Sequence, residues 1–169
     1  MRAQSETLVF ILLFLLSIIL FSIAMFWGRD IFQKNIGMTR VSSAEKFMKE
    51  LDYSIQSLVK SDGKQEITYN VDGPIALIDD KTIETSTTVD SDISLPTEWT
   101  NISESSHISE KLDGKNLRIR LEYPEDDSYR LELFTEGPTL SKPRVVRIEK
   151  NSTYYEDGKL TIKIRITLV

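Results

Sequence analysis

The sequence contains no cysteine, and this absence removes several kinds of chemistry at once. Disulfide bonds, thiolate nucleophiles and cysteine-based zinc sites are all excluded. The chain of 169 residues must therefore be stabilised by the packing of its core. Histidine occurs once, as His107 in the polar segment 104–110. We expect a solvated loop side chain there, with no second histidine to share a metal ion.

Catalytic and cofactor motifs are also lacking. The chain has no Gly-rich phosphate loop, no nucleophile elbow and no HExxH motif. The acidic run Glu125-Asp126-Asp127 lacks the alternating ligands and the glycine of a calcium loop, so we expect a hydrated turn, with a weak calcium site as the alternative. We therefore predict that the protein is not an enzyme and has no catalytic residues, metal ligands or cofactor.

Basic residues are too few in the distal part of the chain for a nucleic-acid partner. Residues 1–69 carry eight Lys/Arg and seven Asp/Glu, whereas residues 70–169 carry thirteen and nineteen. Affinity for nucleic acid comes largely from basic side chains that neutralise phosphates, and an acidic surface repels them. Nucleic acid is therefore excluded as a partner.

The most prominent feature that is present is an apolar run from Thr7 to Trp27. Only Thr7, Ser17 and Ser22 in this run are not strongly apolar, and none of its residues is charged. Its helical length of roughly 31 Å matches a hydrocarbon core of about 30 Å. A buried core helix would keep a polar stripe, and a cleaved secretory signal would end in small residues. We therefore predict a short leader at 1–6 and a transmembrane or filament-core helix at 7–27.

A second helical pattern follows, with apolar residues three and four positions apart. The spacing predicts an amphipathic helix over 28–62 that continues the first, with weak points at Gly28 and Gly37 and a stop at Gly63. Its expected apolar face comprises Ala44, Phe47, Met48, Leu51, Ile55, Leu58 and Val59. Its expected polar face comprises Glu45, Lys46, Lys49, Glu50 and Asp52.

From Glu66 onward the period becomes two, which is typical of half-buried strands. The alternation is clearest at 117–123, 129–133 and 160–168, and weaker at 66–71, 75–78, 82–88 and 144–150. Asp157-Gly158 predicts a tight hairpin, and segment 89–112 is expected to be a long surface excursion. The predicted fold class is α+β, with a long N-terminal hydrophobic and amphipathic helix packed on an antiparallel β-sheet or β-sandwich at 63–169.

The first residues, Met1-Arg2-Ala3-Gln4-Ser5-Glu6-Thr7, form a short basic leader that runs directly into the apolar helix. Because Ala3 precedes the apolar stretch, cleavage after it would leave the helix attached to the mature protein. In this order of features the sequence resembles archaeal type IV pilin-like proteins, whose class III signal peptides carry a basic and a small residue before the cut, often followed by Gln. The resemblance implies that a prepilin-type peptidase recognises Arg2 and Ala3 and exposes Gln4.

The resemblance also implies a structural subunit, a pilin or pseudopilin, that assembles with copies of itself or with other pilin-like subunits. An apolar helix can exchange lipid contacts for helix–helix contacts where small and polar groups allow close approach. Ser17, Ser22 and Ala24 are the candidates, and the alternative is that they are ordinary residues of a lone anchor. Glu6 is the third residue after the cut, whereas pilins with a helix-proximal acid place it fifth. Its alternative role is that of an acid favourable at a helix N-terminus.

Two signals oppose each other on the placement of the distal domain. The positive-inside rule disfavours an extracytoplasmic domain, because one basic residue precedes the span and three follow it: Arg2, then Arg29, Lys34 and Arg40. Two Asn-X-Ser/Thr acceptors, at Asn101 and Asn151 in turn-like segments, favour an extracytoplasmic and glycosylated domain. We expect the extracytoplasmic placement.

The sequence therefore predicts a single-pass protein of the cell membrane, or a subunit of a surface filament. The alternative is an uncleaved single-pass envelope protein whose β-domain binds an S-layer protein or another partner in a surface machine. The two hypotheses differ in the fate of the leader at Ala3.

Overall fold

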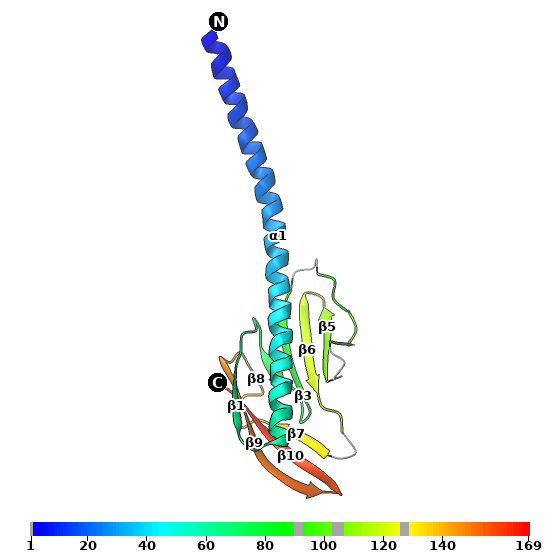
Figure 1. The fold of residues 1–169 in the computed structure, drawn as a ribbon. Helices are drawn as coiled ribbons and strands as arrows, with labels where there is room; N and C mark the ends of the chain where they lie inside the picture. Colours follow the sequence, from blue (N-terminus) through cyan, green and yellow to red (C-terminus); the bar gives the residue numbers. More distant parts are fainter. Residues whose placement is uncertain (1, 90–92, 103–106, 126–128) are drawn as a thin grey trace. The chain divides into compact units, whose positions relative to one another are not determined.

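The computed structural model describes residues 2–89, 93–102, 107–125 and 129–169, without the side chains of residues 2–8 and 30. These residues form one α-helix followed by β-strands (Figure 1). The elements are α1 (Arg2–Lys60), β1 (Lys64–Thr68), β2 (Ile75–Leu77), β3 (Thr82–Thr88), β4 (Thr100–Asn101), β5 (Ile108–Asp113), β6 (Asn116–Glu122), β7 (Tyr129–Phe134), β8 (Leu140–Ser141), β9 (Val145–Glu156) and β10 (Lys159–Leu168).

The chain divides into two compact units, residues 1–36 and 37–169. The first consists of the N-terminal part of α1, and the second combines the rest of α1 with the strands. Helical structure runs through both Gly28 and Gly37, as expected for one long helix. The boundary lies at Gly37, so residues 28–36, which the sequence pattern groups with the amphipathic helix, belong to the first unit.

The apolar face of α1 in the second unit is buried as the sequence predicts. Met48, Leu51 and Ile55 are 0% exposed, and Phe47 packs edge-on against Tyr69 with ring centroids 4.8 Å apart. Each fully buried aliphatic side chain contributes about 1.5–3 kcal/mol. The helix ends at Lys60, and Gly63 beyond it has φ +140°, a conformation that favours glycine. Residues of α1 and of both sheets belong to one hydrophobic core.

The strands form two sheets, as predicted for an α+β fold. One sheet has the order β1-β9-β10-β7 and the other β4-β5-β6-β3-β2-β8. Alternation explains their burial: Ile162, Ile164 and Ile166 of β10 are each at most 3% exposed, whereas the residues between them are only half-buried. The predicted Asp157-Gly158 hairpin is also confirmed. It joins β9 to β10 with φ 50° and 79°, as a type I′ turn requires.

One strand pair does not follow the predicted antiparallel arrangement. β10 pairs with β7 in parallel, with Ile162 opposite Leu131 and Ile164 opposite Leu133. No hairpin joins these two strands, because the chain passes through β8 of the other sheet and then through β9 before it reaches β10. Their direction is therefore set by sheet assembly, which local turn residues do not reveal.

The prediction of a surface excursion over 89–112 is wrong for some of its described residues, although residues 97–101 are exposed. β4 and β5 lie in this segment, and Val89 and Ile108 are each 1% exposed. Ile108 pairs with Leu121 of β6, so the register of β6 turns Ile108 into the core although its neighbours in sequence are polar.

Candidate functional site

The first candidate site is the exposed apolar surface of α1 in the N-terminal unit. Large apolar side chains cover the helix on all sides from Val9 to Trp27, and Phe10, Phe26 and Trp27 are 76%, 77% and 74% exposed. None of the most apolar window is buried by the rest of the chain. The helix is long and apolar enough to cross a membrane. An apolar surface of this extent marks a membrane or protein contact.

The predicted assembly residues Ser17 and Ser22 use their hydroxyls within the helix. Ser17 Oγ donates to the carbonyl of Leu13 at 2.9 Å, and Ser22 Oγ donates to that of Ile18 at 2.8 Å. A hydroxyl bonded to the preceding turn adds no unpaired polar group to the apolar surface. Both serines therefore suit a lipid environment with or without a partner helix.

The predicted assembly residue Ala24 lies one turn before Gly28. The two small residues floor a shallow groove on the helix surface, flanked by Phe21, Met25 and Phe32. A Cβ added to Gly28 would meet no atom within 4 Å, so the chain itself does not require a glycine there.

The predicted processing residues Arg2, Ala3 and Gln4 lie in the first turn of α1, and Glu6 follows this turn in the same helix. Their side chains fall outside the description of the structure, so these predictions stay predictions.

The two glycosylation acceptors lie in strands, so the prediction of turn-like segments is wrong. Asn101 is exposed in β4, at the edge of its sheet, and Ser103 of its motif falls outside the described residues. Asn151 is exposed within β9. Lys163 pairs with Ser152 and Ile164 with Lys150, which leaves Asn151 as the extra residue of a β-bulge. Both asparagines are therefore accessible, Asn101 in an edge strand and Asn151 at a bulge.

A polar contact joins α1 to the end of β6 in the interior of the second unit. The Tyr123 hydroxyl donates to Asp52 Oδ1 at 2.7 Å, and the Gln56 amide donates to the same oxygen at 3.0 Å. Asp52 is only 7% exposed, so its predicted place on the polar face of the helix is wrong. Burial, and next the Asp52 charge, raise the pKa of Tyr123, which keeps its hydroxyl protonated as the donor.

His107 is also placed differently from the expected solvated loop. Its ring lies against that of Tyr123 with centroids 5.3 Å apart, and its Nδ1 atom is buried without a hydrogen-bond partner. The backbone amide of Glu122 donates to the His107 carbonyl at 2.9 Å. The start of β5 therefore places this histidine against the buried ring of Tyr123.

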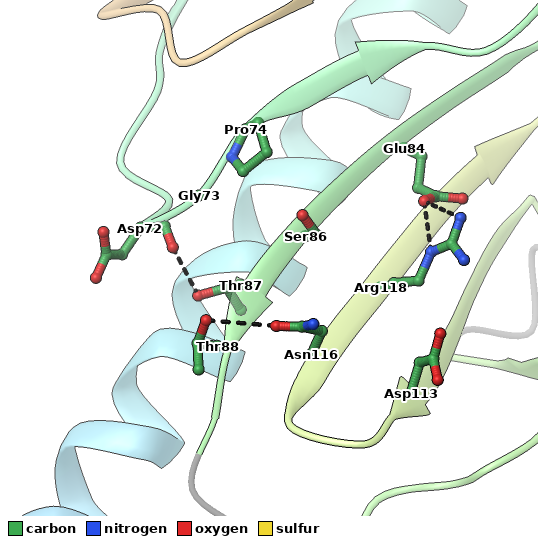
Figure 2. Close-up of a pocket in the computed structure, with 10 residues that line it drawn as sticks. All are labelled: Asp72, Gly73, Pro74, Glu84, Ser86, Thr87, Thr88, Asp113, Asn116 and Arg118. Atoms are coloured by element: carbon green, nitrogen blue, oxygen red, sulfur yellow. Dashed lines mark hydrogen bonds and ion pairs between the residues drawn. The ribbon is translucent and has the colours of Figure 1, made fainter.

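The second candidate site is a polar hollow of about 400 Å³ on the sheet that contains β3 and β6 (Figure 2). Its lining includes the loop 72–74, Glu84, Ser86, Asn116 and Arg118. Ile83 and Thr85 alternate with Glu84 and Ser86 along β3, so the Glu84 and Ser86 side chains extend from the opposite face of the sheet to Ile83 and Thr85. Asp113, at the end of β5, lines the opposite side from the loop.

Most charges around the polar hollow are paired. Glu84 is only 7% exposed. It forms ion pairs with Arg118 at 2.6 Å and with Arg120 at 3.4 Å. Arg120 also lies over the Trp99 ring, 4.2 Å from its centroid. Asp72 pairs with Lys142 at 2.8 Å and Arg40 at 3.2 Å, and these cations, Lys142 first, lower its pKa. The hollow therefore has polar walls with little unbalanced charge.

The loop 72–74 is held against β3 by a close backbone approach. Thr87 Oγ1 donates to the Asp72 carbonyl at 3.0 Å, and the Tyr69 hydroxyl donates to the Gly73 carbonyl at 2.9 Å. A Cβ added at Gly73 would lie 1.7 Å from the carbonyl oxygen of Ser86. Only glycine fits this approach, and it fixes one wall of the hollow.

The polar hollow is not predicted by the sequence pattern. The period-two pattern indicates that Ser86 and Arg118 face outward, but not that the loop 72–74 closes over one side of them. The one available signal was the Gly73-Pro74 pair, which marks a turn without placing it.

The described residues contain no group of three or more His, Cys, Asp or Glu side chains arranged to hold a metal ion. Within the acidic run expected to form a hydrated turn, Glu125 is instead paired with Lys81 at 2.7 Å and Arg130 at 2.8 Å. Asp126 and Asp127 fall outside the described residues.

Comparison with protein families, with curated proteins and with solved structures finds no match to this chain.

Proposed function

We propose that this protein is a membrane-anchored structural subunit resembling an archaeal type IV pilin or pseudopilin. The observation that carries the proposal is the helix α1, which is apolar and uncovered from Val9 to Trp27 and contributes Val41 to Leu58 to the core of the β-domain. One helix thus offers an apolar surface for membrane or filament and a firm attachment for the domain.

The exposed surface needs a cover, because apolar area left in water costs about 25 cal/mol per Å². Lipid supplies that cover for a single subunit, since all backbone groups of a helix are satisfied internally. Neighbouring helices supply it in a filament, where the groove at Ala24 and Gly28 admits a close partner. The same surface thus serves as anchor before assembly and as core afterwards.

In this proposal a prepilin-type peptidase recognises Arg2 and Ala3 and leaves Gln4 as the first residue. The β-domain lies outside the cytoplasm, where Asn101 and Asn151 are accessible for N-glycosylation. The two Asn-X-Ser/Thr motifs support this placement, because N-glycosylation occurs outside the cytoplasm.

Two measurements, one on native membranes and one on intact cells, test the proposal. Mass spectrometry of the N-terminus should find Gln4 first. Because the chain has no cysteine, Tyr155→Cys, at a residue 78% exposed, adds one thiol that a membrane-impermeant maleimide should label on intact cells. Labelling only after lysis would place the domain in the cytoplasm and contradict the proposal, as would an intact leader in assembled filaments.

The second candidate function is an uncleaved envelope protein whose β-domain binds an S-layer protein or another surface partner. The polar hollow favours it, because a purely structural subunit needs no such depression. An intact Met1 on the native, monomeric, externally labelled protein would support this second candidate instead.

A further inference from the structure

The polar hollow has the size of a ligand site and an unusual lining for one. Its volume of about 400 Å³ falls in the range of about 300–1,000 Å³ found for small-molecule sites. Such sites are mostly apolar, whereas this one is lined by hydroxyl, amide, carboxylate and guanidinium groups. An apolar ligand would remove water from these groups and offer no hydrogen bonds in return.

The pairing of charges argues against a small ion as the ligand. Glu84 is neutralised by Arg118 and Arg120, and Asp72 by Lys142 and Arg40. An anion would meet the carboxylates of Asp72, Glu84 and Asp113. A metal ion finds no suitable set of ligands among the described residues.

Three groups of the hollow keep free hydrogen-bonding capacity. Within the described part of the chain, the Ser86 hydroxyl and the Asp113 carboxylate have no side-chain partner. Asn116 uses only Oδ1, which accepts from Thr88 at 3.5 Å, so its amide N–H groups remain available. Figure 2 shows these groups on neighbouring strands, with Asn116 between Thr88 and Asp113. A donor, an acceptor and a hydroxyl therefore stand around one depression.

We propose that the polar hollow binds a neutral carbohydrate through the Ser86 hydroxyl, the Asn116 amide and the Asp113 carboxylate. Each sugar hydroxyl can both donate and accept a hydrogen bond. Adjacent sugar hydroxyls therefore match an amide donor, a carboxylate acceptor and a hydroxyl, and the sugar needs no net charge. The paired Arg118 side chain and the loop held by Gly73 also line the hollow.

A peptide is the less favoured occupant. Extended peptides bind through main-chain hydrogen bonds at the open edge of a sheet. The hollow lies on β3 and β6, which both have neighbours on either side in the order β5-β6-β3-β2. Their backbone groups are already paired, so recognition falls to the side chains.

The proposal goes beyond the function proposed above and requires neither cleavage at Ala3 nor assembly. It is tested with the full chain in phosphatidylcholine nanodiscs, because sugar detergents would compete. The readout is the ¹H–¹⁵N NMR signals of the Ser86 backbone amide, the Asn116 side chain and the Arg118 Nε–H. Glucose, galactose, mannose and N-acetylglucosamine are titrated, with glucuronic acid and glucosamine as charged analogues.

We expect at least one neutral sugar to shift these three signals together and saturably. Ser86→Ala and Asn116→Leu should each weaken that binding about threefold to tenfold, as expected for one lost hydrogen bond. Ser109→Ala is the matched control, since Ser109 lies on β5 opposite Arg120 and outside the hollow. It should leave the affinity unchanged.

A glycopeptide with a neutral N-linked glycan, and the same peptide without its glycan, identify the source. Binding of free sugars indicates a polysaccharide source, and binding of the glycopeptide alone indicates a glycoprotein. Equal shifts from the bare peptide would overturn the proposal. So would a stronger response to the charged analogues, shifts located elsewhere, or no response of the folded parent chain to either the neutral sugars or the glycopeptide.

Discussion

The hydroxyl of Tyr123 donates a hydrogen bond to the buried carboxylate of Asp52 across 71 positions of sequence. This contact joins the helix α1 to the end of β6. Among the described residues, Gln56 is the only other side chain that donates a hydrogen bond to Asp52. A buried carboxylate that loses a donor keeps its desolvation cost without the compensating bond. The contact therefore links the docking of the helix to the sheet.

Tyr123→Phe should destabilise the second unit by about 1–3 kcal/mol, because it leaves the Asp52 carboxylate underbonded while preserving the aromatic volume. Tyr155→Phe is the matched control, since Tyr155 is 78% exposed, and it should change stability by less than about 0.5 kcal/mol. Thermal unfolding of the full chain, followed by circular dichroism, compares the two. Equal melting temperatures would show that the hydrogen bond contributes nothing.

Gly73→Ala should cost about 1–3 kcal/mol, because the new methyl group would overlap the Ser86 carbonyl and force the loop 72–74 away from β3. Gly137→Ala provides the control, since its nearest new contact would be the Thr135 hydroxyl at 3.9 Å. Denaturant unfolding measures both variants. If Gly73→Ala were as stable as Gly137→Ala, the close approach of the loop to β3 would not exist in solution.

The ion pairs of Glu125 predict a stability change at acid pH. Hydrogen bonds from Lys81 and then Arg130 lower its pKa from 4.5 to about 2. A carboxyl whose pKa is lower in the folded state stabilises the fold above its unfolded pKa and loses this effect as pH falls. The melting-temperature difference between the wild type and Glu125→Gln should therefore be constant near neutrality and shrink between pH 4.5 and about 2.

High salt should reduce the same difference, because these side chains are exposed enough to be screened. A difference that persists unchanged at the lowest pH would mean that Glu125 acts through packing and not through its charge.

The parts of the fold that could be predicted are those that local pattern determines. The spacing of Phe47, Leu51 and Ile55 defines a helix face, and Asp157-Gly158 allows the positive φ angles of its hairpin. Contacts between segments that are distant in the sequence cannot be predicted from the local pattern of either segment. The local sequence predicts a surface position for Asp52, which is buried by its contact with Tyr123. It likewise predicts a loop position for Ile108, which pairs with Leu121 of β6.

The candidate sites divide in the same way. The apolar helix from Val9 to Trp27 is evident from composition alone, because nothing else in the chain needs to be known to see that it lacks charge. The polar hollow depends on the loop 72–74, β3 and the hairpin between β5 and β6. Its residues are ordinary outward-facing polar residues in the sequence, and only the approach permitted by Gly73 makes them a depression.

The last prediction concerns processing of the leader. Ala3 stands between a basic residue and the uninterrupted apolar helix, and the proposed peptidase must fit it into its active site. Ala3→Trp should obstruct cleavage and retain Met1-Arg2-Ala3, whereas Arg2→Lys, which keeps the charge, should be processed. Neither change alters the apolar residues from Val9 to Trp27, so both variants should still reach the membrane. N-terminal mass spectrometry and sedimentation of filaments report the two steps separately. Filament incorporation should fail for Ala3→Trp alone, and normal assembly of this variant with its leader intact would leave the tethered envelope protein as the better account.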